Sequence, residues 1–348
     1  MVTGGTVDQA SPPRWSRRTV LRVAVTAGLV IPIGVATVVL RRHENVGAAV
    51  NLSSTTPTAS GASATRAASP APTATPTASP TPAASPATFE FRPKNVGTGE
   101  ATLLIVHATE RLGQVRFLDQ TYPLWQQDGL LWAILGVPVD AALGPRTAEI
   151  TLQDADSKTT KRVAAVTSVI AVERPIDYLE VTDEVQSLLT PEAGVTEDQL
   201  RAKEFSAFDA TASWAQPFIQ PAPGSVSTQF GSGRSVNGGT VGGFHLGADI
   251  ANDRGTLVVA AAPGRVAFIE THPIRGISVI IDHGAGVKSG YHHLEAALAK
   301  PGDVVEAGTL IGRMGTTGYS TGPHLHWEVT VYGVNVDPFT WTRETFRP

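Results

Sequence analysis

The sequence predicts a mainly β protein that an N-terminal helix anchors in a membrane. Short runs rich in β-branched and apolar residues recur from residue 89 onward, and Gly, Pro and Asp turns separate them. Residues 324–329 (HLHWEV) alternate polar and apolar side chains with the period of a half-buried strand. Residues 23–40 carry no charge and approach the length of a membrane span. Together these patterns predict strand-rich domains that follow a membrane anchor.

The composition excludes several classes of function. The formal net charge is −4, so no basic surface favours binding to nucleic acid. The chain has no cysteine. This absence excludes a cysteine nucleophile, a cysteine-ligated structural zinc, a disulfide framework and a lipid-modified N-terminal cysteine.

Residues 1–48 are interpreted as a cytoplasmic tip and a transmembrane anchor, or as an export signal. More arginines precede the apolar run 23–40 than follow it, which places the N-terminus inside and the rest of the chain outside. The stretch 16–22 (SRRTVLR) also resembles a twin-arginine export signal, and small residues near Ala48 would permit cleavage. The arginine pair that begins at Arg41 favours an uncleaved anchor. We therefore expect a single-pass protein of the cell membrane, with export after signal cleavage as the alternative.

Residues 49–88 are almost entirely Ser, Thr, Pro and Ala. Such a composition cannot bury a hydrophobic core, so the segment is predicted to be a disordered linker. Proline keeps a chain of this kind extended at about 3 Å per residue, so ~40 residues reach roughly 120 Å. The linker is either a stalk that lets a tethered domain sample the cell wall or a passive spacer.

Residues 89–185 contain several short strand-like runs between turns, a spacing that predicts a small β-sandwich domain without a catalytic cluster. Residues 186–220 are predicted to form a helical connector. Its helix is expected at 196–208, because Thr196 and Gln199 have the spacing of a capping box.

The last domain, residues 221–348, contains seven of the nine histidines. Side chains two residues apart lie on one face of a strand, so His324, His326 and Glu328 are expected to point the same way. A His-x-His pair alone is a weak signal, because nine histidines produce such pairs by chance. Glu328 either orients a neighbouring imidazole or forms a simple ion pair on the strand.

Other candidate ligands lie earlier in the same domain. His245 and Asp249 are four residues apart in a glycine-rich stretch, which can bend so that their side chains converge. His292 and His293 are adjacent, so only one of them is expected to enter a shared site; strand alternation does not say which. His272 and His283 are expected in loops or at strand ends and are given no role.

The set of ligands favours catalytic over structural zinc. Structural zinc sites are closed by four protein ligands, often cysteines, whereas catalytic sites use three ligands and leave a position for water. This chain offers a His/Asp/His set with spare histidines for proton transfer. It has no His-Glu-x-x-His motif, which excludes the zincin arrangement.

From about 224 to 340 the chain resembles the lysostaphin-type zinc endopeptidases of peptidoglycan. The motifs STQFGSGRSVNGG, FHLGADIA, YHHL and TGYSTGPHLHWEV occur in the order of that family. The resemblance implies a compact antiparallel β domain with a groove across its sheet, built on a duplicated hybrid motif. It also implies one Zn²⁺ held by His245, Asp249 and His326, with catalytic roles for His293 and His324. The resemblance thus selects His293 over His292.

The function implied by this resemblance is zinc-dependent hydrolysis of peptide cross-links in bacterial peptidoglycan by a metal-activated water. The chain lacks the tyrosine that some members place before the metal histidine, at 225–244, so His293 and His324 would also have to stabilise the oxyanion. One alternative is a catalytically silent wall-binding activator of other hydrolases. A less favoured alternative is a serine hydrolase using Ser320 in the sequence GYSTG, which lacks the helix that a nucleophile elbow requires after the serine.

Overall fold

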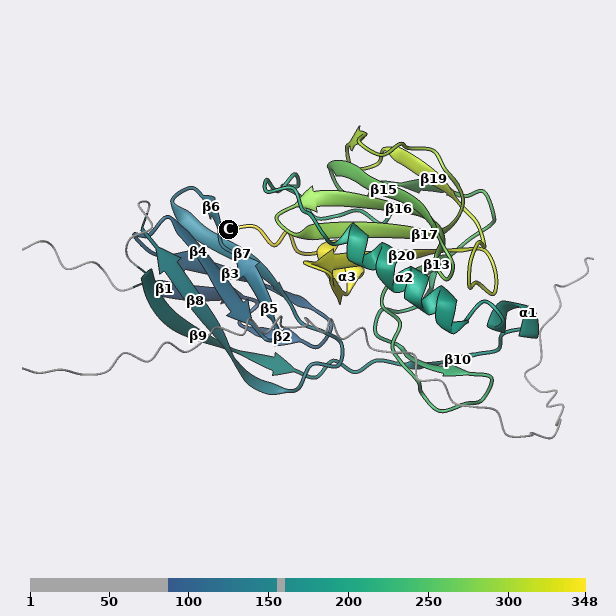
Figure 1. Ribbon diagram of the computed structural model, residues 1–348, viewed down its shortest axis with the longest axis horizontal. Coiled ribbons are helices and arrows are strands. Elements are labelled where there is room, and N and C mark those ends of the chain that lie inside the picture. Colours follow the sequence, from purple (N-terminus) through teal and green to yellow (C-terminus); the bar gives the residue numbers. More distant parts are fainter. Residues whose placement is uncertain (1–86, 155–159) are drawn as a thin grey trace, which may run out of the picture. The chain divides into compact units, whose positions relative to one another are not determined.

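The computed structural model describes residues 87–154 and 160–348, which form a mainly β structure with three short helices (Figure 1). The β class predicted from the sequence is confirmed. The predicted membrane span at 23–40 and nearly all of the predicted linker at 49–88 lie outside the described residues. Within the described ranges, no helix combines the length and the apolar character that crossing a bilayer requires.

Two sheets form the N-terminal part of the described chain. One has the strand order β1-β3-β7-β6 and the other β2-β9-β8-β4-β5, with only the β2–β9 pair parallel. Apolar side chains from both sheets, such as Leu104, Ile134, Val115 and Ile150, belong to one buried cluster. The strands are β1 (Thr88–Arg92), β2 (Asn95–Gly97), β3 (Ala101–His107), β4 (Leu112–Phe117), β5 (Gln120–Pro123), β6 (Trp125–Gln127), β7 (Leu130–Gly136), β8 (Gly144–Gln153) and β9 (Thr160–Ile170).

A connecting segment contributes one strand and two helices. Strand β10 (Ile176–Leu179) pairs in parallel with β12 (Gly233–Val236) of the C-terminal part. Helix α1 (Asp183–Gln186) follows, and then helix α2 (Pro191–Glu204).

The predicted start of the second helix was wrong. Thr190, not Thr196, is the N-cap: its hydroxyl accepts a hydrogen bond from the Ala193 backbone N–H. Pro191 occupies the first helical position, where its fixed φ suits a helix and its missing N–H costs nothing. The helix therefore begins earlier than predicted and already ends at Glu204.

The C-terminal part is built on a ten-stranded sheet with the order β11-β13-β20-β17-β16-β15-β18, to which β14, β19 and β21 attach. The described neighbours in this path are antiparallel. The bounds are β11 (Ser225–Thr228), β13 (Ala248–Ala251), β14 (Leu257–Val259), β15 (Gly264–His272), β16 (Gly276–Gly284), β17 (Val287–Ala297), β18 (Val304–Val305), β19 (Leu310–Met314), β20 (His324–Val331), β21 (Val334–Val336) and α3 (Pro338–Trp341).

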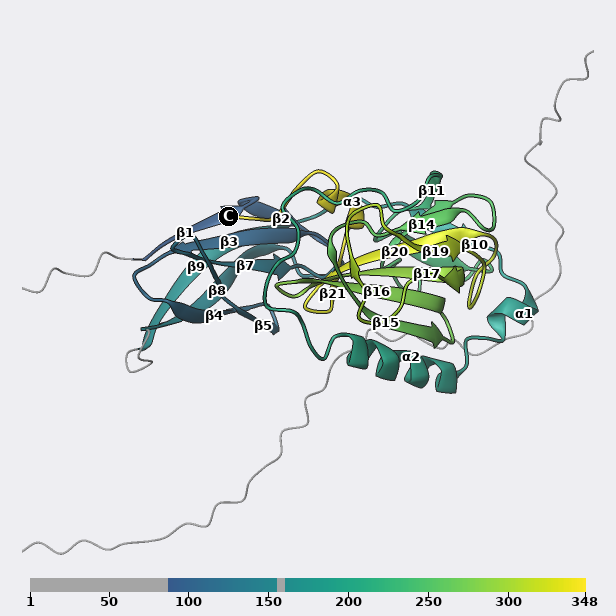
Figure 2. The ribbon, with the colours of Figure 1, turned by 90° about the horizontal axis from the view of Figure 1, so that it is seen from above.

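Strand β20 lies in the middle of this sheet and has two chemically different faces. Leu325, Trp327 and Val329 are fully buried in the hydrophobic core. The other face carries His324, and then the buried polar residues His326 and Glu328. Helix α2 packs against the same sheet, beside β15 (Figure 2).

Candidate metal centre

Pairing of β13 with β20 brings two of the predicted ligands together. Asp249 lies directly opposite His326 in this antiparallel register. His245 lies in the loop before β13, where its backbone N–H donates to the Ser232 carbonyl at 2.9 Å and its carbonyl accepts the Gly231 N–H at 2.7 Å. These backbone contacts hold the loop beside the strand pair, so ligands from two distant stretches of sequence, 245–249 and 326, meet at one point.

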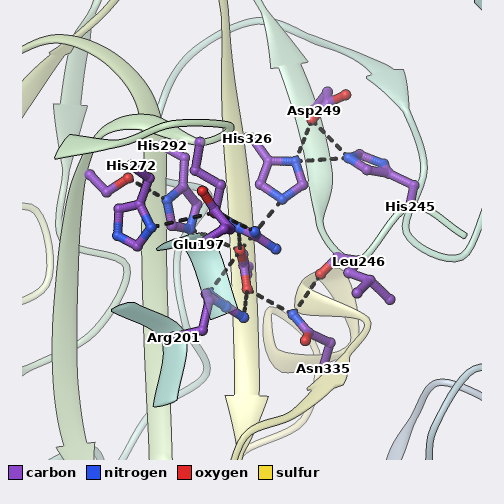
Figure 3. A network of polar contacts seen from close by, with 12 residues as sticks. Glu197, Arg201, His245, Leu246, Asp249, His272, His292, His326 and Asn335 are labelled. Atoms are coloured by element: carbon purple, nitrogen blue, oxygen red, sulfur yellow. Dashed lines mark hydrogen bonds and ion pairs between the residues drawn. The ribbon is translucent and has the colours of Figure 1, made fainter. Parts of the chain in front are cut away.

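The donor atoms of the three predicted ligands form a small triangle (Figure 3). His245 Nε2 is 2.8 Å from His326 Nδ1 and 3.0 Å from Asp249 Oδ1. His326 Nδ1 is 2.8 Å from Asp249 Oδ1. All three residues are buried. The structure thus brings together the metal ligands that the sequence motifs predicted.

The pKa values of two of the three predicted ligands, His245 and Asp249, favour the deprotonated form that binds a metal. Burial lowers the pKa of His245 to about 4, and its Nδ1 faces the Gln229 carbonyl at 3.1 Å, so a neutral ring directs the Nε2 lone pair inward. Burial alone would raise the pKa of Asp249, but the two neighbouring imidazoles outweigh it and hold the pKa well below its usual range. For His326, burial is outweighed by hydrogen bonds to Asp249 and Glu328, which raise its pKa.

The donor set and its dimensions fit a zinc ion. Two imidazole nitrogens and one carboxylate oxygen are the ligands of a catalytic zinc, whose tetrahedral bonds of about 2.0–2.1 Å hold donors about 3.3 Å apart. The observed separations of 2.8–3.0 Å are within a few tenths of an ångström of that value. Small side-chain shifts would therefore admit the ion.

Gly247 makes room for the third ligand. A Cβ atom at this position would lie 2.7 Å from both Cε1 and Nε2 of His326 and 2.7 Å from the Trp327 carbonyl oxygen. Any larger residue would displace the imidazole. A glycine is therefore required between His245 and Asp249, because only glycine leaves room for the His326 ring.

The two predicted catalytic histidines lie on one side of this cluster. The ring centroids of His293 and His324 are 4.7 Å apart, and His293 is 5.9 Å from the ring of His326. His293 Nδ1 faces the Thr317 carbonyl at 2.7 Å, and His324 Nδ1 faces the Gly322 carbonyl at 2.8 Å. A carbonyl can only accept, so each Nδ1 carries the proton and each Nε2 has a free lone pair.

The two adjacent histidines of β17 both lie near the ring of His326, but only His293 packs against His324. His293 has φ of 57°, a left-handed conformation that is unusual without glycine. This backbone breaks the alternation of β17, so both residues lie near His326: the ring centroid of His292 is 5.5 Å away. His292 is fully buried and hydrogen-bonded to Ser278 through Nδ1 at 2.8 Å, whereas His293 lies with His324. The alternation of side chains along a strand does not predict a residue with a left-handed backbone.

Sequence reasoning missed two further polar groups near the cluster. Arg234 Nη2 lies 3.9 Å from Asp249 Oδ2, and its Nε is a buried donor without a partner in the described part of the chain. The buried Tyr319 hydroxyl also has no partner there. Burial raises the pKa of Tyr319, and the nearby charge of Arg234 opposes that shift. Neither the spacing nor the motifs singled out these two donors.

Ser320 lacks the surroundings of a hydrolase nucleophile. Its hydroxyl donates to the Gly322 carbonyl at 2.8 Å, and the chain continues directly into strand β20 rather than into a helix. His324 Nδ1 is 3.3 Å from Ser320 Oγ, but that nitrogen donates its proton to the same Gly322 carbonyl. His324 therefore presents no unprotonated nitrogen that could take the proton of the Ser320 hydroxyl.

Comparisons with known proteins agree with this geometry. The family model "Peptidase family M23" matches residues 243–338. The peptidoglycan DD-endopeptidase ShyB of Vibrio cholerae is 40% identical over 93 residues, which are 27% of this chain and 22% of that protein. The DD-carboxypeptidase/endopeptidase Mpg of Neisseria meningitidis is 43% identical over 95 residues, which are 27% of this chain and 22% of that protein. The match thus spans about a fifth of the length of these relatives.

A crystal structure of a Pseudomonas aeruginosa protein, described as a peptidase M23, shares the fold over a longer stretch. It is 24% identical with a TM-score of 0.54, and the match covers 70% of this chain and 94% of that one. The ligand triangle lies inside the residues that the family model matches. The chain therefore contains a domain of peptidase family M23, which confirms the resemblance that its motifs predicted.

Proposed function

We propose that the C-terminal domain is a zinc-dependent endopeptidase that hydrolyses the peptide cross-links of bacterial peptidoglycan. The observation that carries the proposal is the convergence of His245, Asp249 and His326 on one point beside two imidazoles with free Nε2 atoms. Relatives named as peptidoglycan DD-endopeptidases and a DD-carboxypeptidase/endopeptidase support this class of substrate.

The three donors would hold one Zn²⁺ through His245 Nε2, Asp249 Oδ1 and His326 Nδ1. Bound there, the ion would polarise the scissile carbonyl and lower the pKa of the attacking water. The Gln229 carbonyl fixes the tautomer of His245, because it accepts from Nδ1 and so leaves Nε2 for the metal.

His293 and His324 would move the protons of the reaction. Each has Nδ1 held by a backbone carbonyl and Nε2 free, so one ring would take a proton from the attacking water while the other, once protonated, delivers one to the leaving amine. The left-handed backbone at His293 places its ring against that of His324, which concentrates both proton carriers on one side of the cluster.

The test is digestion of purified cross-linked peptidoglycan with the full-length protein, followed by mass spectrometry of the released fragments. We expect new peptide ends that a chelator abolishes and added Zn²⁺ restores, and the fragment masses will identify the bond. Release of no peptide ends despite bound zinc would contradict the proposal and favour a catalytically silent activator. Activity that survives the chelator but is lost to a serine-directed inhibitor would favour Ser320.

His324→Ala separates catalysis from metal binding. Because His324 is placed beside the cluster rather than in it, the variant should retain zinc and its fold while turnover falls by a factor on the order of a hundred or more. Zinc content, circular dichroism and turnover measured on one preparation check this. Loss of zinc from a folded variant would contradict the division of roles.

The substrate requires the domain to lie outside the cytoplasm, and we propose a membrane-anchored location on the evidence of residues 16–48 alone. Fractionation of cells and protease treatment of intact spheroplasts test this. Recovery of the full-length chain in the membrane fraction with an accessible C-terminal domain is expected. A shortened, freely released chain would favour signal cleavage instead.

A further inference from the structure

Helix α2 packs on the sheet with a charged face instead of an apolar one. Its buried residues are Glu197 and Glu204, which are 4% and 1% exposed, and Arg201 lies between them with its side chain 14% exposed. The spacing i, i+4, i+7 places these three side chains on one face of the helix. An ordinary surface helix would bury an apolar stripe at such positions. The helix also lies outside residues 243–338, which the family model matches.

The charged face of α2 makes defined contacts with two places in the domain (Figure 3). Arg201 donates from Nη1 and Nη2 to Glu328 Oε1 and Oε2 at 3.2 and 2.8 Å, a two-pronged ion pair. Glu197 accepts from Arg275 Nη1 at 2.7 Å and from the Ile274 backbone N–H at 3.1 Å. Arg275 Nε in turn donates to Glu328 Oε1 at 2.6 Å. Two arginines therefore hold one carboxylate from two directions.

Glu328 lies directly behind the metal cluster. Its Oε1 is 3.7 Å from His326 Nε2, the ring nitrogen opposite the one that belongs to the ligand triangle. It is also 2.9 Å from His292 Nε2, a contact without the alignment of a hydrogen bond. Glu328 Oε2 accepts from Asn335 Nδ2 at 2.7 Å, and Asn335 also donates to the Leu246 carbonyl at 2.8 Å, next to His245. The contacts of this carboxylate thus reach the surroundings of two of the three predicted ligands.

The contacts of Glu197 reach the catalytic side of the centre. Glu197 holds the turn at residues 274–275, between β15 and β16. The Arg275 carbonyl accepts the backbone N–H of His293 at 2.8 Å, and the Ile274 carbonyl accepts that of Tyr319 at 2.7 Å. His293 is the residue with the left-handed backbone, so its position depends on contacts that hold it there. One helix therefore supports both the metal side and the proton-transfer side of the centre.

The charges of this buried group balance. Glu197, Glu204 and Glu328 are opposed by Arg201, Arg275 and His272. Burial lowers the pKa of His272, but its contacts with Glu197 and Glu204 outweigh burial and raise the pKa to about 9. Buried ion pairs usually stabilise a fold no better than apolar packing of the same volume. A network of this kind is therefore better explained by the geometry that it imposes than by stability.

We propose that α2 is a positioning element of the metal centre, in which Arg201 fixes Glu328 behind His326 and Glu197 fixes the turn that holds His293. The inference rests on the proposed function in that the His/Asp/His triangle binds zinc and His293 takes part in the reaction. Arg201, Glu197 and Glu328 are positioning residues, because they act through the ligands and the catalytic histidines.

The first test compares Arg201→Gln with Lys203→Gln in the full-length protein. Lys203 is on the exposed side of the same helix, with its side chain 55% exposed and paired with Glu270, so it controls for general effects on the helix. Loss of a residue that orients a metal ligand typically costs about 10–100-fold in metal affinity. We expect Arg201→Gln to show that loss of Zn²⁺ affinity in chelator competition and an altered absorption spectrum of its Co²⁺-substituted form. Arg201→Lys should recover part of the Zn²⁺ affinity. Lys203→Gln should match the wild type in each measurement.

The results distinguish the two hypotheses. A folded Arg201→Gln variant with the Zn²⁺ affinity and Co²⁺ spectrum of the wild type would overturn the inference and leave the proposed function intact. A wild-type protein that binds no zinc would overturn both.

A second pair of variants tests the catalytic side and serves if Arg201→Gln does not fold. Glu197→Gln keeps the shape of the side chain but weakens its hold on Arg275, and Asp198→Asn changes an exposed neighbour. We expect Glu197→Gln to lower kcat about tenfold, corresponding to ~1.4 kcal/mol, with KM unchanged. Asp198→Asn should leave both parameters unchanged. An unaltered kcat in a folded Glu197→Gln variant would overturn this part of the inference.

Discussion

The two N-terminal sheets of residues 88–170, which share one buried core and are called the sandwich here, and the ten-stranded sheet of residues 225–336 bury different kinds of side chain. Among the described residues of the sandwich, the buried polar side chains are those of three threonines, within a core of Leu, Ile, Val and aromatic residues. The C-terminal sheet buries many more polar and titratable groups: His245, Asp249, His272, Asp282, His283, Lys288, His292, His293, His326 and Glu328. Apolar burial stabilises a fold in proportion to area, whereas each buried polar group costs free energy unless it is paired.

The comparison separates residues that hold the fold together from residues that perform chemistry. Strand β20 contains both kinds at alternate positions: Leu325 and Trp327 belong to the hydrophobic core, and His326 belongs to the metal cluster. Changes in the sandwich should therefore alter stability without altering the centre. Changes at the centre should alter zinc binding more than stability.

Replacing Asp249 by Ala should have the largest effect on function. The change removes the only carboxylate of the ligand triangle and leaves two buried imidazoles. Loss of a metal that contributes several kcal/mol to the transition state should lower turnover on the order of 10³-fold or more. Zinc content by atomic absorption and turnover on peptidoglycan check this, with the exposed Asp253→Ala as control. A folded Asp249→Ala protein that keeps one zinc per chain would show that the triangle is not the site.

Replacing Gly247 by Ala should weaken zinc binding although it adds only one methyl group. The added Cβ would lie 2.7 Å from the His326 ring and from the Trp327 carbonyl, so the ligand must move. We expect zinc affinity to fall about 10–100-fold in chelator competition, as for other changes that misorient a ligand. Gly243→Ala, in the same loop, is a matched control, because no atom lies within 4 Å of its added Cβ. Equal affinities of the two variants would contradict the packing role of Gly247.

The local sequence predicted the ligands better than their surroundings. The resemblance carried by the His-x3-Asp and His-x-His motifs implied three ligands whose donor atoms the structure places within 3.0 Å of one another. The alternation of 324–329 also predicted which residues of β20 face away from the core. The prediction of the two faces depends on side-chain direction along a short segment, which periodicity describes.

The surroundings depend on contacts between distant segments, which periodicity does not describe. Arg201 meets Glu328 across 127 positions of sequence, and nothing local to helix α2 identifies that partner. The same helix was predicted to begin at Thr196 because a capping-box spacing occurs there, whereas Thr190 and Pro191 provide the actual start. The left-handed backbone at His293 could likewise not be predicted from the sequence, because tertiary contacts maintain it and no glycine marks the position.

Replacing Leu104 by Ala should change stability without changing the centre. Leu104 is fully buried in the sandwich core, so the cavity left by the substitution should cost about 2–5 kcal/mol. Denaturant unfolding followed by fluorescence measures the loss, and Leu112→Ala, at an exposed position, should cost much less. Zinc affinity at a temperature where the protein stays folded should equal that of the wild type. A reduced zinc affinity in the folded Leu104→Ala protein would show that the sandwich supports the centre.

The smallest effect that we predict is a pH dependence of stability from His283. Its side chain lies between the Pro263 carbonyl, 2.7 Å from Nδ1, the Ser289 hydroxyl, 2.8 Å from Nε2, and the ring of Phe218. Burial lowers its pKa to about 4. The unfolded chain takes up a proton as pH falls below about 6.5, whereas the folded protein resists protonation until about 4.

The contribution of the neutral, buried His283 to the free energy of unfolding is therefore fully present above pH 6.5. It is lost as the pH falls from 6.5 towards 4, by about 2 kcal/mol between pH 7 and pH 5. The difference between wild type and His283→Gln, both measured without metal in a chelator, isolates this contribution, because His283→Gln cannot titrate. If His283→Gln lost stability on acidification as steeply as the wild type, the buried imidazole would not be the source of the pH dependence. Burial of polar groups in the C-terminal sheet would then cost less free energy of folding than the composition of its interior implies.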